Sequence, residues 1–504
     1  MHALRPRFCQ RPPEAARAAS ADAGPAAGRA QFLSVFSSVL LPMFLASVDQ
    51  TLLATASPAI ARDFGALADT SWIALGYLMA AAVMIPMYGR LGDRLGHRRV
   101  LATALAVFVL GSTLGGFAPA MGWLVAARVL QGLGGGGLMV LSQALIGQLL
   151  PPRERPRYQG YFAAVYTLSS LAGPVLGGLV VHLAGWRWLF WGLLPLGLLA
   201  MWRVLQLPRL APAAAPRAGS DPLGVALFAG ASVLSLLWLG FAGQRFAWAS
   251  PTSVGLAGAA AALWTGLVRR ERRHPAPFLP VEMLRLPGVR PTVGTVVVFA
   301  GALFALVFFL PIYVQMGRGG TASDAGVLLL PLTLGVAAGG VASGRLATRT
   351  GRVGVLPSAG LCVSALSLGV LALAPPDAGL LTLLCVFCGL GFGTVMPNAQ
   401  VILQTLAGRS RLGAASAAVS LSRAVGSTVG TALFGAALFG QLGSGDAMKM
   451  PLARSAQAAA RIVSAYHWAF GDLALLLLLG AALARRMPVI ALDAAAPAAS
   501  TGNE

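Results

Sequence analysis

The sequence predicts an all-α protein that crosses a membrane many times. Of its 504 residues, 57% are apolar and 11% are charged, whereas about 25% of the residues in an ordinary soluble domain are charged. The mean hydropathy is +0.75, and no half of the chain is polar. Apolar stretches of helical length alternate with clusters of Pro, Gly and Arg, whereas a transmembrane barrel would show alternating segments of about 10 residues. These observations indicate a polytopic helical membrane protein.

Fourteen transmembrane helices are predicted from apolar length and from the positions of helix breakers. We expect them at residues 33–58, 72–89, 100–118, 123–149, 158–181, 188–205, 223–242, 254–268, 291–314, 326–346, 355–374, 379–403, 412–438 and 466–483. Asp221 precedes a proline at the start of the seventh span. This is the pattern of an N-cap followed by proline in the first turn, so Asp221 is interpreted as structural.

The basic residues predict the orientation. With fourteen spans, both ends of the chain lie on one side of the membrane. Of the 37 Lys and Arg residues, 28 fall on that side, 7 on the other, and the remaining 2, Arg128 and Arg423, inside spans. Because cytoplasmic loops are rich in Lys and Arg, both termini are expected in the cytoplasm and the protein in the inner (plasma) membrane. The net charge of +21 therefore requires no nucleic acid. Residues 1–31 are expected to be a disordered basic cytoplasmic tail.

The sequence contains no motif typical of nucleotide binding or of metal binding. A Walker A loop needs Gly-Lys followed by Ser or Thr, but Lys449, the only lysine, lies between two methionines. This chain therefore encodes no ATP-driven pump. Cys385 and Cys388 have a Cys-x-x-Cys spacing, but they lie inside an apolar span without a second Cys or His pair, so packing residues are expected. We predict no cofactor, no metal and no enzyme active site.

A repeated segment indicates a duplicated fold. The sequence Gly89-Arg90-Leu91, followed by Arg94 and Gly96, recurs 255 residues later as Gly344-Arg345-Leu346, followed by Arg349 and Gly351. The copies follow the second and the tenth span, eight spans apart instead of six, so two helices are predicted to be inserted between two six-helix halves. The expected 6 + 2 + 6 organisation comprises a bundle at 32–206, an insert with its loops at 207–290, a bundle at 291–486 and a flexible tail at 487–504. Such repeats are typical of secondary transporters.

Ionisable residues inside spans are the strongest functional signal, because a lone charge at a helix centre costs at least about 2.5–3.5 kcal/mol. Asp49 lies about 25 Å along a helix that enters from the cytoplasm, and Arg128 about 8 Å along one that enters from outside, so both fall at similar depth. A direct contact or a shared water-filled cavity would let Asp49 bind and release a proton. A static structural pair is the alternative. Arg423, about 16 Å into its span, either lines a cavity or satisfies carbonyl groups at a helix break.

Other polar side chains in the spans are candidates either for a substrate cavity or for interhelical hydrogen bonds. They are Gln131, Tyr313, Asn398, Gln400 and Gln404. Asp324, at the start of the tenth span, is interpreted as a helix cap. Asp472 lies near the outer interface, where we expect it to be solvated.

Two glycine motifs indicate tight turns or close helix packing. The glycines from Gly89 to Gly96 permit a tight turn, and Asp93 can bind backbone N–H groups at the positive end of a helix. A basic loop that only sets topology is the alternative. Gly173-Pro174 lets two helices approach closely. This close approach serves either a conformational change or helix packing alone.

These segments resemble the major facilitator superfamily, in particular its fourteen-helix drug:proton antiporter branch. The segment from Gly89 to Arg99 is similar to the signature loop between the second and third helices. Similar motifs of that branch are Asp49-Gln50-Thr51, Arg128 with Gln131-Gly132, Gly173-Pro174 with Gly177-Gly178, and Arg423-x-x-Gly426. Ala54, Ser57, His97 and Ser169 depart from the usual pattern. The resemblance covers nearly the whole chain outside the tails and implies the major facilitator fold.

The resemblance also implies roles for individual residues. The signature loop would hold the cytoplasmic side shut in the outward-open state, and Asp49 with Arg128 would couple protons. The implied conformational gate comprises Gly89, Asp93, Arg94, Gly96, Gly173, Pro174, Gly344 and Arg345.

The predicted function is proton-coupled secondary transport that exports small amphipathic compounds, such as drugs or antibiotics, by alternating access. A proton-coupled importer of a small metabolite is the alternative within transport, and a membrane receptor without transport is a further one. The expected partners are the lipid bilayer, protons and a small-molecule substrate, for a protein that acts as a monomer. Arg423 would repel a cation, and Asp49 is the only acid placed deep in a span, so neutral and anionic amphiphiles are open as substrates.

Overall fold

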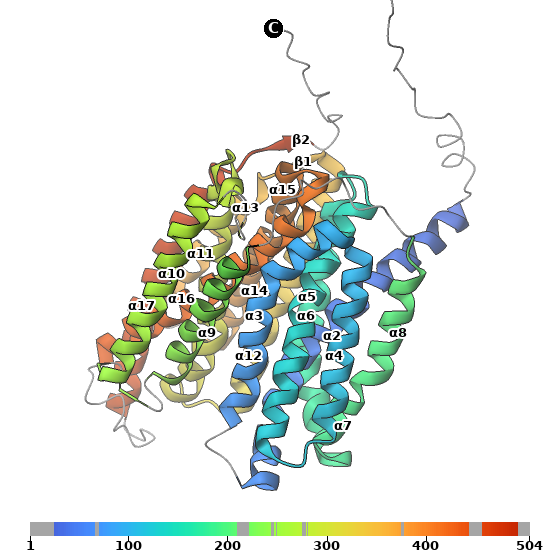
Figure 1. The fold of residues 1–504 in the computed structure, drawn as a ribbon. Helices are drawn as coiled ribbons and strands as arrows, with labels where there is room; N and C mark the ends of the chain where they lie inside the picture. Colours follow the sequence, from blue (N-terminus) through green and yellow to red (C-terminus); the bar gives the residue numbers. More distant parts are fainter. Residues whose placement is uncertain are drawn as a thin grey trace, which may run out of the picture.

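A computed structural model describes residues 25–65, 70–208, 221–242, 246–247, 249–274, 279, 281–373, 377–442 and 456–491. Nearly all of the secondary structure in these residues is helical, and the long helices lie side by side in one bundle (Figure 1). Thirteen helices within the described ranges are long and apolar enough to cross a membrane. The prediction of an all-α polytopic protein is confirmed.

The helices of the first half follow the predicted spans closely. They are α2 (Pro25–Phe64), α3 (Thr70–Leu95), α4 (His97–Gly116), α5 (Met121–Leu149), α6 (Arg155–Ala184), α7 (Arg187–Trp191) and α8 (Leu193–Gln206). The sixth predicted span is divided into α7 and α8. Pro195 lies in the first turn of α8 and has no N–H to donate to the carbonyl group of Trp191, which favours an interruption at this position.

The second half has the same helical character. Its elements are α11 (Val289–Ile312), η3 (Tyr313–Gly317), α12 (Ala322–Thr350), α13 (Leu356–Leu373), α14 (Ala378–Gly393), α15 (Val395–Ala407), η4 (Arg409–Arg411), α16 (Leu412–Leu442) and α17 (Ala456–Arg485). The twelfth predicted span is divided into α14 and α15, and Pro397, which cannot donate a backbone hydrogen bond to Gly393, favours an interruption here. The π-helical turn η3 was not predicted from the sequence.

One predicted span is not among the thirteen apolar helices. Thirteen of the fourteen predicted spans overlap the thirteen apolar helices. The remaining span, 412–438, corresponds to α16, which is 31 residues long and contains Arg423 and several serines.

The insert between the halves consists of α9 (Pro222–Phe241), α10 (Pro251–Arg273) and η2 (Val281–Arg285). Asp221 is the N-cap of α9 and accepts a hydrogen bond from the N–H of Gly224 at 2.9 Å, which confirms its predicted structural role. Arg270 Nη2 lies 2.7 Å from Asp221 Oδ1. Burial acts to raise the pKa of Asp221, but the hydrogen bonds from Arg270 and Gly224 outweigh it, and this pKa lies below its usual value.

Among the described residues, buried apolar side chains form three clusters. One spans α2 to α8, and a second spans η2 to α17. The third contains Phe228 of α9 and Leu267 of α10, with Met87 of α3 and Leu421 of α16 packed against it. The insert therefore contacts one helix from each half.

The structure corrects both predicted tails. Helix α2 begins at Pro25, so the expectation of disorder is wrong for residues 25–31, where a proline in the first turn and several alanines favour a helix. Residues 1–24 lie outside the described residues. Strand β2 (Ile490–Ala491) pairs antiparallel with β1 (Arg352–Val353), so residues 490–491 of the predicted tail belong to a strand pair. Residues 492–504 lie outside the described residues. The β1–β2 pair and α7 lie at opposite ends of the bundle (Figure 1).

Candidate functional site

Asp49 of α2 and Arg128 of α5 form a buried ion pair. Arg128 Nη1 donates to both carboxylate oxygens, at 3.0 Å to Oδ1 and 2.8 Å to Oδ2. The exposed fractions of Asp49 and Arg128 are 1% and 2%. Of the two arrangements considered from their depth in the membrane, the structure has the direct contact.

Two further side chains complete this cluster. Gln131 Nε2 donates to Asp49 Oδ1 at 2.9 Å, and Gln131 Oε1 accepts from Arg128 Nη1. The guanidinium group of Arg128 lies 4.4 Å from the ring centre of Tyr77, and its Nε donates to the carbonyl oxygen of Ile73 at 3.3 Å. Helices α2, α3 and α5 therefore meet at one charged cluster, and Gln131 belongs to it instead of lining a cavity.

The chemistry of this cluster follows from its burial. Each charge would be costly in the bilayer without the other, and removing one partner of a buried pair costs about 3–5 kcal/mol. Protonation of Asp49 removes its charge without removing that of Arg128. Changing the proton on Asp49 therefore changes the energy of the contact between α2 and α5.

Gly173 of α6 contacts α2 next to this ion pair. A Cβ atom at Gly173 would lie 1.9 Å from Thr51 Oγ1, so only glycine permits this approach. Thr51 Oγ1 lies 3.0 Å from the carbonyl oxygen of Val48 and 3.2 Å from that of Ser169, within donating distance of both. The motif thus packs α6 against the segment that carries Asp49. The side chain of Pro174 is outside the part of the structure that is described.

Asp93 joins the end of α3 to the start of α16. Its Oδ1 accepts from the N–H of Gly413 at 2.7 Å, and its Oδ2 accepts from the N–H of Ala414 at 2.9 Å. These N–H groups belong to the first turn of α16, where the helix dipole favours a carboxylate. His97 Nε2 lies 3.2 Å from Asp93 Oδ1. A Cβ atom at Gly413 would lie 2.1 Å from the carbonyl oxygen of Gly89, so the two halves are in close contact here.

The predicted tight turn follows Asp93 directly. Gly96 separates α3 from α4 and has a φ of 93°, a conformation that favours glycine. Its N–H donates to the carbonyl oxygen of Gly92 at 2.9 Å. Arg94 lies in the last turn of α3.

The second copy of the repeated motif makes an analogous contact. A Cβ atom at Gly344 of α12 would lie 2.3 Å from the carbonyl oxygen of Pro156 in the first turn of α6. Arg345 follows in the same helix. Thr348 stands 255 residues after Asp93, and its carbonyl oxygen accepts from Arg153 Nε at 3.4 Å. Each copy therefore packs against a helix start in the other half, but only the first copy supplies a carboxylate.

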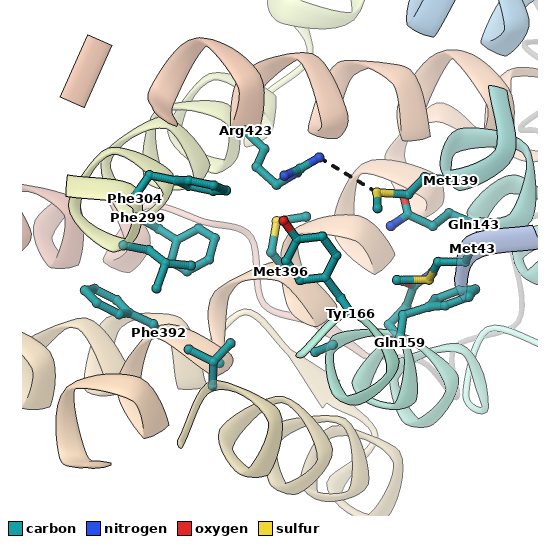
Figure 2. A pocket seen from close by; sticks show the side chains of 15 residues that line it. Met43, Met139, Gln143, Gln159, Tyr166, Phe299, Phe304, Phe392, Met396 and Arg423 are labelled. Carbon is teal, nitrogen blue, oxygen red and sulfur yellow. Dashed lines mark hydrogen bonds between the residues drawn. The ribbon is translucent and has the colours of Figure 1, made fainter. Parts of the chain in front are cut away.

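A cavity lies between the two halves (Figure 2). It has an empty volume of about 670 Å³, including space that is open to its surroundings. Helices α2, α5 and α6 contribute to its wall from the first half, and α11, α12, α14, α15 and α16 from the second. Its lining consists of Met43, Met139, Gln143, Gln159, Phe162, Ala163, Tyr166, Phe299, Leu303, Phe304, Val336, Phe392, Gly393, Met396 and Arg423. The wall is thus mainly aromatic and methionine-rich, with few polar groups.

Residues 39–431 match the family described as the Major Facilitator Superfamily. The chain belongs to this superfamily. It is 33% identical over 406 residues to an uncharacterised MFS-type transporter of Mycobacterium tuberculosis, and the alignment covers 80% of this chain and 59% of that protein. The chain thus spans less than two thirds of the length of that relative. It is also 33% identical over 412 residues to the Tetracenomycin C resistance and export protein of Streptomyces glaucescens, with coverage of 80% and 76%.

Solved structures with low sequence identity share the fold. The structure of the human organic anion transporter MFSD10 (TETRAN) has a TM-score of 0.62 at 15% identity and covers 90% of this chain and 99% of that one. The proton:xylose symporter XylE has a TM-score of 0.59 at 14% identity, with coverage of 89% and 94%. The predicted major facilitator fold is confirmed, and the chain is that of a multi-pass membrane protein.

Arg423 is the one predicted cavity residue that lines the cavity between the halves. The others make the interhelical contacts that were the alternative. Tyr313 is 1% exposed and packs on Tyr466, with ring centres 5.1 Å apart. Asn398 Nδ2 donates to the hydroxyl of Ser343 at 2.7 Å, Gln400 Nε2 to the hydroxyl of Ser416 at 2.6 Å, and Gln404 Nε2 to the carbonyl oxygen of Gln143 at 2.9 Å.

The polar cavity residues Gln143 and Gln159 were not predicted from the sequence, and neither was a contact of Asp63 with Trp186 and Arg187. Asp63, near the end of α2, accepts from Trp186 Nε1 at 2.7 Å and from Arg187 Nη1 at 3.1 Å. This contact ties α2 to the start of α7, at the end of the bundle away from Asp93. A carboxylate at a span end close to a basic aromatic motif was the signal that would have found it.

Of the remaining candidate residues, some have structural roles and others have no assigned role. Asp324 forms a capping box with Thr321 at the start of α12, which confirms the predicted cap. Asp472 is exposed on α17. Cys385 and Cys388 are buried, and within the described residues no group of His, Cys, Asp and Glu could hold a metal ion.

Proposed function

We propose that this facilitator is a proton-coupled exporter of small amphipathic compounds. The observation that carries the proposal is the buried pair of Asp49 and Arg128, which places a titratable carboxylate inside the membrane region, beside the contact between Gly173 and α2. The name of the Streptomyces glaucescens relative, a tetracenomycin C resistance and export protein, supports the export direction. So does that of the multidrug transporter protein MdtP of Bacillus subtilis, which is 29% identical over 418 residues, 81% of this chain and 75% of that protein.

Alternating access would arise from movement of the two halves about the central cavity. We assign the halves and the inserted pair to the 6 + 2 + 6 organisation expected from the repeat. In this conformation Asp93 binds the first turn of α16 and Gly89 contacts Gly413. Opening that end of the cavity requires both contacts to separate, so we propose that they form the cytoplasmic gate.

The membrane orientation of the protein follows the distribution of basic residues. We place both termini in the cytoplasm, because 28 of the 37 Lys and Arg residues fall on that side of the predicted topology. We propose that the protein works as a monomer in the inner membrane. One proton that crosses a potential of 100 mV supplies about 2.3 kcal/mol, enough for a concentration ratio of about fifty-fold.

Inverted membrane vesicles with an acidic interior test this function. Export from the cell corresponds to uptake into such vesicles, so we expect at least one dye from a set of anionic, neutral and cationic fluorescent amphiphiles to accumulate. A protonophore should abolish the accumulation. Asp472→Asn, which removes an exposed carboxylate of α17, should leave it unchanged. Accumulation in right-side-out vesicles instead of inverted ones would favour the importer, and accumulation in neither would refute transport of these amphiphiles.

A further inference from the structure

The central cavity contains a cation without an acidic neighbour. Arg423 extends from α16 into the cavity, toward Met139 and Tyr166 (Figure 2). Its Nη2 lies 3.9 Å from Met139 Sδ, and its Cζ lies 5.8 Å from the ring centre of Tyr166. None of the fifteen residues that line this cavity in the described structure is acidic. A guanidinium group in such a place is stabilised by an anion that enters the cavity.

Two amide side chains in the same wall each have one terminal atom without a hydrogen-bond partner among the described residues. Gln143 Oε1 and Gln159 Nε2 are buried and have no hydrogen-bond partner among the described residues, and both side chains line the cavity. The residues are 4% and 3% exposed. Because buried polar atoms of folded proteins are nearly always hydrogen-bonded, a polar molecule bound in the cavity would supply the partners that these two atoms lack.

The other side chains of the wall are suited to bind an aromatic ring system. Phe162, Tyr166, Phe299, Phe304 and Phe392 contribute rings, and the rings of Phe299 and Phe392 are 5.8 Å apart in an edge-on arrangement. Three methionines, at positions 43, 139 and 396, complete the apolar surface. Aromatic rings and flexible thioethers make favourable contacts with planar aromatic compounds.

We propose that the cavity selects aromatic organic anions. This inference rests on the proposed transport function and names the substrate class for its cavity. A planar apolar body lies against the phenylalanine and methionine side chains, and an ionised oxygen, from a carboxylate, phenolate or enolate group, binds Arg423. Hydroxyl or carbonyl groups on the same body bind Gln143 and Gln159. A cation of the same shape would face an unpaired guanidinium group and is disfavoured.

Two xanthene dyes of opposite charge test this selectivity. Fluorescein is an anion at mildly alkaline pH and rhodamine 123 is a cation, while their aromatic bodies are closely alike. Binding of each dye to the purified full-length protein in lipid nanodiscs is measured by fluorescence anisotropy. We expect the wild type to bind fluorescein at least about tenfold more tightly than rhodamine 123, as for hydrogen bonds to a charged group. Arg423→Gln should weaken fluorescein binding by about tenfold or more and remove the preference.

Matched variants separate charge recognition from folding. Arg461→Gln removes an exposed arginine of α17 and should leave both affinities unchanged, whereas Arg423→Lys should keep part of the preference for fluorescein. Gln159→Leu should weaken fluorescein binding without reversing the charge preference. Equilibrium binding needs no proton gradient, so a protein that fails to couple protons in vesicles can still pass this test. Absent fluorescein binding, equal or tighter binding of rhodamine 123, or an Arg423→Gln protein that binds fluorescein like the wild type would each overturn the inference.

Discussion

At the scale of the residue, the Asp49 carboxylate is held by three hydrogen bonds from α5, two from Arg128 and one from Gln131. It is 1% exposed, so water supplies almost none of its solvation. The charge of Asp49 is therefore balanced by Arg128 and further stabilised by the hydrogen bond from Gln131, a residue of the same helix. Any step that neutralises Asp49 leaves Arg128 with Gln131 Oε1, the ring of Tyr77 and the carbonyl group of Ile73.

A double-substitution experiment measures how strongly the two charges depend on each other. We expect Arg128→Leu to lower the free energy of unfolding by about 3–5 kcal/mol, because it leaves Asp49 buried without its cation. Combining it with Asp49→Leu should restore much of that loss, because apolar side chains replace a buried pair at little cost. Equilibrium unfolding in detergent micelles measures these values. Losses that simply add in the double variant would show that the pair is not coupled.

Depth along a helix could be predicted from the sequence, but rotation about the helix axis could not. Asp49 and Arg128 were expected at one level because depth depends only on the number of residues from the membrane boundary. The position of Tyr77 over Arg128, and that of Gln131 in the ion-pair cluster instead of the cavity, depend on how α3 and α5 turn toward each other. Gln143 and Gln159 were missed for the same reason.

At the scale of the element, the contact of α3 with α16 combines two kinds of interaction. Asp93 supplies a charge to the first turn of α16, and Gly89 with Gly413 allows the backbones to touch. A charge at a helix start contributes about 1 kcal/mol. That energy changes a nearly balanced equilibrium between two conformations several-fold, which is a suitable size for a gate that must also open.

Substitutions at this contact should change transport more than folding. Asp93→Asn removes the charge but no volume, and Gly413→Ala places a methyl group 2.1 Å from the carbonyl oxygen of Gly89. We expect each to lower the rate of dye uptake several-fold at equal amounts of folded protein, and to increase labelling of a cysteine at the buried Ser416. Gly326→Ala, whose Cβ atom would meet nothing within 4 Å, is the control and should transport normally. A wild-type rate of dye uptake in Asp93→Asn would contradict the gate and show that the basic loop only sets the topology.

The lengths of the helices were predictable, and their ends were less so. The lengths of the apolar segments alone located the spans, because the thickness of the bilayer sets the length of apolar helix needed to cross it. Pro195 and Pro397 do not by themselves predict interruptions, since proline within a membrane helix is often tolerated. Helix α2 extends back to Pro25 because an alanine-rich segment can continue a helix beyond the bilayer, where hydropathy gives no signal.

At the scale of the whole molecule, the repeated motif and the number of apolar spans are enough to indicate the fold. The cavity could not be predicted, since it is lined by eight helices from both halves and depends on how those halves pack. The inserted pair contacts Met87 of α3 and Leu421 of α16, the same two helices that the Asp93 contact joins. Movement between the halves would therefore change the contacts of the insert with α3 and α16.

The distribution of basic residues gives a topology that can be tested on intact cells. We expect cysteines introduced at residues 269–290 to react with a membrane-impermeant maleimide only after the cells are opened. Cysteines at residues 440–465 should react from outside, because this segment lies on the side with few basic residues. Strong external labelling of residues 269–290 would contradict the fourteen-span topology.

The central claim is that Asp49 carries the coupled proton, and proton movement itself tests it most directly. Inverted vesicles with an acidic interior contain a pH-sensitive dye, and a transported amphiphile is then added outside. In wild-type vesicles the amphiphile should enter in exchange for protons, and the interior pH should rise. Asp49→Asn, which keeps the size of the side chain and removes the titration, should abolish this pH change while downhill exchange of the amphiphile continues. An undiminished substrate-driven pH change in Asp49→Asn vesicles would show that the proton is carried elsewhere.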